Sequence, residues 1–393
     1  MWGNNISVKG LNMKPFPNIF LALLLLVYIC AEAAFPSPPQ TVGGGQLALS
    51  VPLTVRWQFN SDLTVNLTPA TAGERVYLPL AAGTIVSLRS VDGQMFWKTE
   101  IGGEVSASPI ADDRAVYIAS ETVIPVSREP RATGALRALG RDGGVTLWMR
   151  TFHRPLRGSL AMNSTAIFGG TADGRVFAVE KATGRFLWVF QHWQPFNAHP
   201  SLHGSTLYIG SDDGHLLAIN QRSGEALWRY RTRGAVRGRA VEVDGVVYFG
   251  SADGYVYALN SADGSLRWRA RTGAGVFAVA SAGGGLLVAS LDNFVYKISL
   301  TRGDRLWKRQ LAGRVASEPL TTSDGALFTP LSGDAGVVLD LRDGKQLNSL
   351  PVGEDNNTAA SPVAAGPVLL VTTRHGLLAF SRPDPPAQSK RKE

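Results

Sequence analysis

Tryptophan recurs along this chain at nearly constant spacing, and this repeat restricts the possible folds more than any other feature. Seven tryptophans stand 40, 51, 40, 40, 40 and 39 residues apart, at Trp57, Trp97, Trp148, Trp188, Trp228, Trp268 and Trp307. A repeat of about 40 residues is typical of propellers and solenoids, in which each unit buries its apolar face against the next unit. The spacing therefore predicts a ring or a stack of similar units.

A second set of positions repeats in the same frame, eight times. Each position holds a proline, alanine or leucine. An apolar residue or a threonine stands four residues before it. The eight positions are Pro69, Pro109, Leu160, Pro200, Ala240, Ala280, Pro319 and Pro362. Eight copies of one strand predict eight units.

Each repeat has the pattern of four short strands joined by tight turns. In the fifth repeat the expected strands are 240–243, 246–251, 255–259 and 266–271. They are short and rich in β-branched and aromatic residues, and Asp-Gly pairs at 253–254 and 263–264 suit two-residue hairpin turns. No stretch has a helical period. The sequence therefore predicts an all-β fold, an eight-bladed β-propeller of four-stranded blades.

The last repeat lacks a fourth strand, because three strands between 350 and 380 are followed by Pro383. The segment 53–59, with Trp57 in the usual position, can supply the missing strand. We expect this N-terminal strand to complete the last blade and close the ring, which removes the free sheet edges. A solenoid would need capping repeats, and neither end of the repeat array resembles one.

The N-terminal region has the features of a secretory signal peptide. An apolar run of 13 residues from Ile19 follows Lys9 and Lys14 and precedes small residues, and it is shorter than the ~20 residues of a membrane span. We expect a signal peptide at 1–33, a linker at 34–50, the propeller at 51–381 and a disordered tail at 382–393. Translation from Met13 instead of Met1, and a lipoprotein signal with a lipidated Cys30, remain open.

Composition narrows the functional classes. The net charge is +8, from 39 Lys and Arg against 31 Asp and Glu, which suits an anionic partner or surface. A single cysteine excludes a disulfide framework and a cysteine-based metal cluster. Basic residues are not interleaved with stacking aromatic residues, so we expect no nucleic-acid partner.

The segments 251–259 and 182–188 resemble the repeats of quinoprotein-type (PQQ-like) propellers, and the resemblance extends over roughly residues 50–381. Such repeats occur in pyrroloquinoline-quinone dehydrogenases and in exported scaffolds of the BamB type, which help to assemble outer-membrane β-barrel proteins. The resemblance implies that the repeated tryptophans pack between blades. Asn348 stands in the eighth tryptophan slot, which predicts one weakened or polar junction.

The resemblance to the dehydrogenases implies a calcium ion, an aspartate base and often a disulfide between adjacent cysteines. This chain has no cysteine pair, and Asp212-Asp213 is only a fragment of the oxygen set that calcium needs. His199 and His203 stand four residues apart, a spacing without meaning for a metal in a β segment. We therefore expect no catalytic residue, no cofactor and no metal site.

The candidate partner-binding residues are basic or aromatic: Arg157, Arg237, Arg239, His199, Trp193, Arg128 and Arg131. The resemblance places the first strand of each blade at the central axis, where small residues are expected and where arginine, histidine, Phe277 and Glu318 are departures. The arginines could form a cationic sector that binds carboxylates, or pair internally with Glu318 or Glu242. Trp193 lies outside the repeat register and is a candidate exposed anchor, with ordinary packing as the alternative.

An insertion within 121–134 lengthens the second repeat, and we expect it to be a binding loop that interrupts two strands. Together with the resemblance, these features predict an exported, non-catalytic scaffold in the periplasm or at the periplasmic face of the outer membrane. Its most specific form is a BamB-like monomer within a hetero-complex with the outer-membrane barrel-assembly machinery, with peripheral membrane association. The alternatives are a small quinone-dependent dehydrogenase and a periplasmic sensor or carbohydrate-binding propeller.

Overall fold

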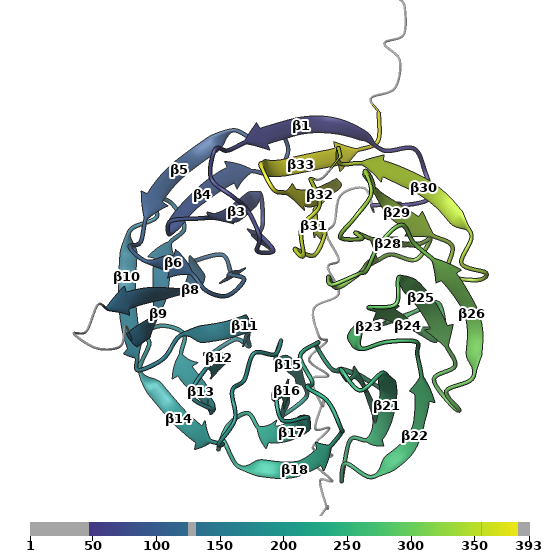
Figure 1. Cartoon of the computed structure of the whole chain (residues 1–393). Helices are drawn as coiled ribbons and strands as arrows, with labels where there is room; N and C mark the ends of the chain where they lie inside the picture. Colours follow the sequence, from purple (N-terminus) through teal and green to yellow (C-terminus); the bar gives the residue numbers. More distant parts are fainter. Residues whose placement is uncertain (1–46, 125–130, 355, 384–393) are drawn as a thin grey trace, which may run out of the picture. The chain divides into compact units, whose positions relative to one another are not determined.

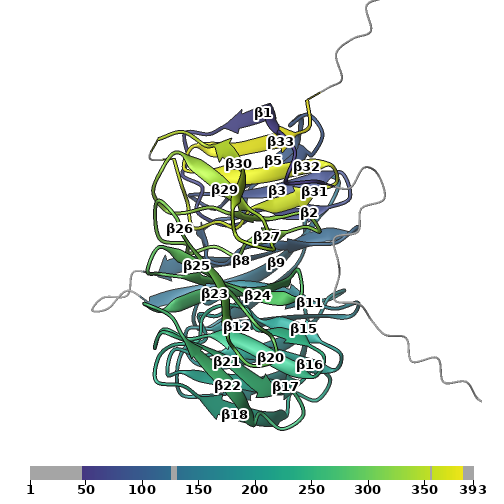
Figure 2. The same cartoon turned by 90° about the vertical axis from the view of Figure 1, so that its right-hand side faces the viewer.

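The computed structural model describes residues 47–124, 131–354 and 356–383. These residues form eight antiparallel sheets, arranged as the blades of a ring around a central axis (Figure 1). Seen from the side, the blades form a single layer (Figure 2). The predicted all-β, eight-bladed propeller is confirmed. Among the described residues no helix is long and apolar enough to cross a membrane.

The first four blades follow one another in chain order. Blade 1 contains β2 (Ala70–Ala72), β3 (Arg75–Leu80), β4 (Thr84–Arg89) and β5 (Met95–Glu100), and blade 2 contains β6 (Glu104–Val105), β7 (Ile110–Ala111), β8 (Ala115–Ile124), β9 (Arg131–Gly140) and β10 (Thr146–Phe152). Blade 3 contains β11 (Leu156–Met162), β12 (Ala166–Thr171), β13 (Arg175–Glu180) and β14 (Phe186–Gln191), and blade 4 contains β15 (Ser201–His203), β16 (Thr206–Gly210), β17 (His215–Asn220) and β18 (Ala226–Arg231).

The remaining blades complete the ring. Blade 5 contains β19 (Val241–Val243), β20 (Val246–Gly250), β21 (Tyr255–Asn260) and β22 (Leu266–Arg271), and blade 6 contains β23 (Val276–Ala282), β24 (Gly285–Ser290), β25 (Phe294–Ile298) and β26 (Arg305–Gln310). Blade 7 contains β27 (Leu320–Thr321), β28 (Ala326–Phe328), β29 (Ala335–Leu339) and β30 (Gln346–Pro351), and blade 8 contains β31 (Val363–Ala365), β32 (Val368–Thr373), β33 (Gly376–Ser381) and β1 (Thr54–Asn60). The strands predicted for the fifth repeat match β19–β22 to within one residue at each end.

Blade 8 takes its outer strand from the N-terminal end of the ring. β1 pairs antiparallel with β33, from Thr54 opposite Ser381 to Asn60 opposite Gly376, and the two strands lie side by side in Figure 1. The predicted closure by the N-terminal strand is therefore confirmed.

Each repeated tryptophan packs between two blades, as the resemblance implied. Trp228 in β18 is buried, and a Cβ placed on Gly264, in the outer turn of blade 5, would lie 2.7 Å from its ring. Its indole N–H donates to the Ser261 carbonyl at 2.8 Å. The indole N–H groups of the other six repeated tryptophans donate in the same way, to the backbone carbonyls of Ser90, Arg141, Lys181, Gln221, Leu300 and Leu341.

The eighth junction is polar, as Asn348 predicted. Its side-chain N–H group donates to the carbonyls of Val51 at 2.8 Å and Leu49 at 3.3 Å. Asp324 accepts bonds from the backbone N–H groups of Leu49 at 3.2 Å and Ser50 at 2.9 Å, and from the Ser50 hydroxyl at 2.6 Å. Leu49 is fully buried between blades 7 and 8. The described end of the expected linker, residues 47–50, thus packs against the ring.

The insertion in blade 2 lengthens a hairpin. β8 and β9 are ten residues each and pair continuously from Ala115 opposite Gly140 to Ile124 opposite Arg131. The expectation of a loop that interrupts two strands was therefore wrong for 121–124 and 131–134, where β-branched residues continue the ladder. The rest of the insertion, with Arg128, lies outside the described residues, as do the predicted signal peptide with Cys30, residues 34–46 of the expected linker and the tail from 384.

Candidate functional site

One face of the ring, which we call the loop face, carries the connections between blades. Strand direction alternates within a blade, so the turns between the second and third strands lie at this same face. Contacts join the two sets of loops: the His192 N–H donates to the Gly174 carbonyl at 2.7 Å, and the Asp212 N–H to the Pro195 carbonyl at 3.1 Å. The loop face brings together Trp193, Arg237, Arg157 and the β8–β9 hairpin.

Trp193 lies on the connection between β14 and β15 and is 82% exposed, more than any other large apolar side chain among the described residues. The one aromatic ring recorded near it in the described part of the chain is that of His192, with ring centroids 5.8 Å apart. Nothing in the repeat requires an aromatic residue here. An apolar ring held in water on a rigid loop is typical of a binding anchor.

The three predicted arginines each pair with a carboxylate. Arg157 lies 2.7 Å from Glu121, Arg237 lies 2.9 Å from Asp212, and Arg239 lies 3.1 Å from Glu318. Each arginine thus has an internal partner, and for Arg239 it is Glu318, one of the two acids that the sequence suggested. The side chains of Arg128 and Arg131 lie outside the described residues.

A small polar network bridges blades near the central axis. Glu318, before β27, lies 3.1 Å from His199 Nδ1 and 3.1 Å from Arg239 Nε, so one carboxylate joins blades 4, 5 and 7. The Phe277 ring of blade 6 meets the His199 ring edge-on, with centroids 6.2 Å apart. Burial by itself would raise the pKa of Glu318, but the charge of Arg239 and the hydrogen bond with His199 outweigh it and hold this pKa below its ordinary value. Glu318 is therefore ionised at neutral pH.

The channel opens into a cavity of about 680 Å³ at the face opposite the loop face. Inner strands line it with mostly small and apolar residues, and Glu242 is the one carboxylate in the lining. The Tyr208 hydroxyl donates to Glu242 at 2.6 Å, and His203 Nε2 lies 3.7 Å from the same carboxylate. His199 and His203 thus contact different acids and do not meet.

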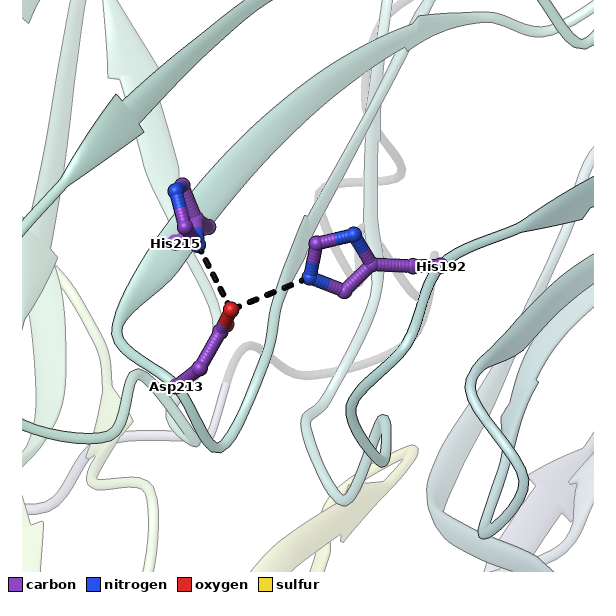
Figure 3. Close-up of side chains that lie close together, drawn as sticks. All are labelled: His192, Asp213 and His215. Carbon is purple, nitrogen blue, oxygen red and sulfur yellow. Dashed lines mark hydrogen bonds and ion pairs between the residues drawn. The ribbon is translucent and has the colours of Figure 1, made fainter.

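Sequence reasoning missed a cluster of His192, Asp213 and His215 (Figure 3). His192 follows β14 in blade 3, whereas Asp213 and His215 lie at the β16–β17 turn of blade 4. His192 Nε2 lies 3.2 Å and His215 Nδ1 lies 2.9 Å from Asp213 Oδ2. Burial by itself would raise the pKa of Asp213, but hydrogen bonds from Ser211 and the two histidines lower it below its ordinary value. One signal in the sequence could have indicated this cluster. One repeat later, the positions of His192 and His215 hold Thr232 and Tyr255.

Comparison with known proteins gives a family match over most of the ring. A family model described as outer membrane protein assembly factor BamB matches residues 132–238 and 233–386. Two curated relatives carry the same description: one from Shewanella oneidensis is 30% identical over 115 residues, and one from Yersinia pestis is 31% identical over 114 residues. Each alignment covers 28% of this chain and 26% of the relative, so the matches span about a quarter of these relatives.

Solved structures share the fold at low sequence identity. The crystal structure of BamB from Moraxella catarrhalis has a TM-score of 0.70 at 16% identity, covering 85% of this chain and 99% of that chain. The computationally designed Ika8 protein has a TM-score of 0.72 at 15% identity, covering 86% and 100%. A quinohemoprotein alcohol dehydrogenase from Comamonas testosteroni has a TM-score of 0.68 at 11% identity, covering 87% and 78%. At these identities the likenesses show a shared fold.

Proposed function

The chain belongs to the family of outer membrane protein assembly factor BamB, and from this membership we propose an exported, non-catalytic scaffold in the periplasm. Its partner is a protein of the outer-membrane barrel-assembly machinery. The chain acts as a monomer within that hetero-complex, at the periplasmic face of the outer membrane.

The exposure of Trp193 is the observation that supports this proposal most directly. An indole that is 82% exposed gains more from a partner's apolar pocket than a side chain already packed in the ring. Its loop is held in place, because the Asp212 N–H donates to the Pro195 carbonyl and Asp212 accepts from Asn197. A loop that is already ordered loses little conformational entropy on binding.

Arg237 extends the anchor into a patch of mixed chemistry. Its guanidinium lies 2.9 Å from Asp212 and its side chain is 57% exposed, so it retains N–H groups for a partner's acceptor. We call Trp193, Asp212 and Arg237 the docking patch. Tryptophan and arginine are enriched at the centres of protein interfaces, and the net charge of +8 favours an acidic partner surface.

The chemistry of the channel supports a non-catalytic role. A calcium-assisted dehydrogenase needs six to eight convergent oxygen ligands, whereas one carboxylate, Glu242, lines the cavity and is bonded to Tyr208. The two basic side chains of the lining, His203 and Arg239, are paired with Glu242 and Glu318.

Cross-linking of the mature chain in membranes of the producing cell, followed by mass spectrometry, tests the proposal. We expect recovery of a barrel-assembly protein, and a loss of affinity of roughly 30-fold on Trp193→Ala, the size of a hot-spot residue. Arg237→Glu should weaken recovery as well. Leu147→Ala is the matched control, since Leu147 is 60% exposed in an outer strand away from the loop face.

Recovery that is insensitive to both patch variants would overturn the docking patch. Absence of any barrel-assembly protein would overturn the scaffold role, and titration with quinone and calcium would then test the dehydrogenase alternative.

A further inference from the structure

Two histidines and an aspartate converge at the junction of blades 3 and 4, on the loop face. One ligand atom from each of His192, Asp213 and His215 lies within 4.8 Å of the other two (Figure 3). His192 is buried, and the other two are partly buried. This cluster has no part in the proposed docking contacts, so its role has to be argued from its own chemistry.

We propose that His192, Asp213 and His215 bind a divalent transition-metal ion, with zinc as the expected ion. Two imidazole nitrogens and one carboxylate oxygen form a donor set that suits zinc, nickel, copper or cobalt and is a poor set for calcium or magnesium. Three protein ligands leave a fourth tetrahedral position for water.

The spacing of the donor atoms matches the size of such an ion. Ligand bonds of 2.0–2.1 Å at tetrahedral angles place neighbouring donor atoms about 3.3 Å apart. The distances from Asp213 Oδ2 to His192 Nε2 and His215 Nδ1 are 3.2 and 2.9 Å. The ring centroids of His192 and His215 are 5.6 Å apart and the ring planes are inclined at 78°. The two rings therefore approach the Asp213 carboxylate from different sides. Small side-chain rotations therefore suffice to surround an ion.

The contacts within the cluster already direct its donor atoms towards one another. His215 Nδ1 is buried, and its contact with Asp213 Oδ2 at 2.9 Å is an interaction that a bound ion would replace. The other oxygen, Asp213 Oδ1, accepts from the Ser211 hydroxyl, which orients the carboxylate as outer partners do in metal sites.

The neighbouring blades show that the fold does not need histidine at these positions. In blade 5 the corresponding residues are Thr232, Asp253 and Tyr255, and Asp253 accepts from the Tyr257 hydroxyl at 2.7 Å. In blade 6, Asp292 accepts from Tyr296. In blade 4 the position of this tyrosine holds Leu217, which has no hydroxyl to donate. The imidazoles of His192 and His215 face Asp213 instead.

A bound ion would connect the end of blade 3 to the second hairpin of blade 4. Blade junctions elsewhere are connected by tryptophan packing and hydrogen bonds, so the metal would add a coordination link between two blades. It would also fix the residue immediately before Trp193.

Titration of the metal-free mature chain with zinc chloride, followed by calorimetry, tests the proposal. We expect one equivalent to bind, a higher Tm with zinc present, and a tetrahedral-type visible spectrum with cobalt chloride. The variant H192T/H215Y installs the residues of blade 5, so the blade is expected to fold, and it should weaken zinc binding by about 100-fold or more. Asp213→Asn provides a second, nearly isosteric loss of a ligand.

His203→Gln serves as the matched control, because His203 lies at the opposite face, near Glu242, and should leave zinc affinity unchanged. Equal zinc binding by H192T/H215Y would overturn the proposal and show adventitious binding elsewhere. Absence of binding by the unmodified chain at millimolar zinc would also overturn it and leave a hydrogen-bonded cluster. Neither result depends on the docking patch, since the assay contains no partner protein.

Discussion

Seven blade junctions and the junction between blades 7 and 8 solve the same packing problem with different residues. At a regular junction a tryptophan ring lies on the outer turn of the next blade, as Trp228 does on Gly264. Blade 8 has no such turn, because its third strand, β33, and its outer strand, β1, come from opposite ends of the ring. Residues 49–51 occupy that place, and Asn348 donates to two of their carbonyls.

The difference shows how chain connectivity determines the chemistry of a contact. A regular junction depends on burial of a large uncharged ring, which is insensitive to pH. The closing junction depends on Asn348, on the Asp324 carboxylate and on the buried side chain of Leu49. The tryptophan repeat thus stops where the turn on which it packs is absent.

Removal of a tryptophan from a regular junction should have the largest effect. Trp228→Ala leaves a cavity beside Tyr208 and Gly264 and removes the bond to the Ser261 carbonyl. We expect the free energy of unfolding to fall by about 3–5 kcal/mol, measured by urea denaturation. Trp193→Ala is the control, since a side chain that is 82% exposed should change stability by less than about 0.5 kcal/mol. Similar losses for the two variants would contradict the assignment of Trp228 to the junction.

Loss of the carboxylate at the closing junction should have an intermediate effect that depends on pH. Burial by itself would raise the pKa of Asp324, but bonds from Ser50, Thr322 and Leu49 lower it to about 2. Because this pKa lies below that of the unfolded chain, the stabilisation is complete at neutral pH and is lost as the pH falls from about 4 towards 2. Asp324→Asn should therefore cost about 1–2 kcal/mol at pH 7.

The difference in unfolding free energy between Asp324→Asn and the unmodified chain should shrink when both are measured at about pH 2.5. A difference that is equal at the two pH values would show that the ionised carboxylate does not hold residues 49–50.

Changes at Asn348 should have the smallest effect. Asn348→Ala removes the bonds to the Leu49 and Val51 carbonyls but leaves those that Asp324 accepts, and it should cost about 1 kcal/mol in thermal or urea unfolding. Asn348→Trp tests the comparison more sharply. It places the tryptophan of the repeat at a junction where the next blade has no outer turn with a glycine for the ring to pack on. We expect this variant to be no more stable than the unmodified chain. A clear gain in Tm would show that the tryptophan does not need the turn.

Much of the fold could be predicted because it is encoded in local patterns. Strand length and Asp-Gly turns act within single repeats, and the 40-residue spacing aligns the repeats, so the strands of blade 5 and the polar slot at Asn348 were predictable. The closure by β1 followed from a count, because the last repeat lacks one strand and the segment 53–59 carries the repeat tryptophan. The β8–β9 extension was not, because an insertion can either continue a ladder or form a loop, and cross-strand pairing decides between them.

The candidate site depends on contacts between blades, which no single repeat contains. Arg239 and Glu318 lie two blades apart, and their pairing follows from the curvature of the ring. His192 and His215 come from successive repeats and meet only because the blades pack. Alignment of the repeats would have shown both histidines as departures, although not that they face the same carboxylate.

The pairing of β1 with β33 also limits when the ring can close. The first strand of the ring joins the last, with Thr54 opposite Ser381, so the two paired strands are separated by nearly the whole ring. Blades 1–7 can form from local contacts as the chain emerges, whereas blade 8 must wait for the C-terminal end of the ring. Until then β33 has an open edge that another chain could occupy. Completion of the ring is thus a single late step, and its rate sets how long the unfinished propeller is exposed to aggregation.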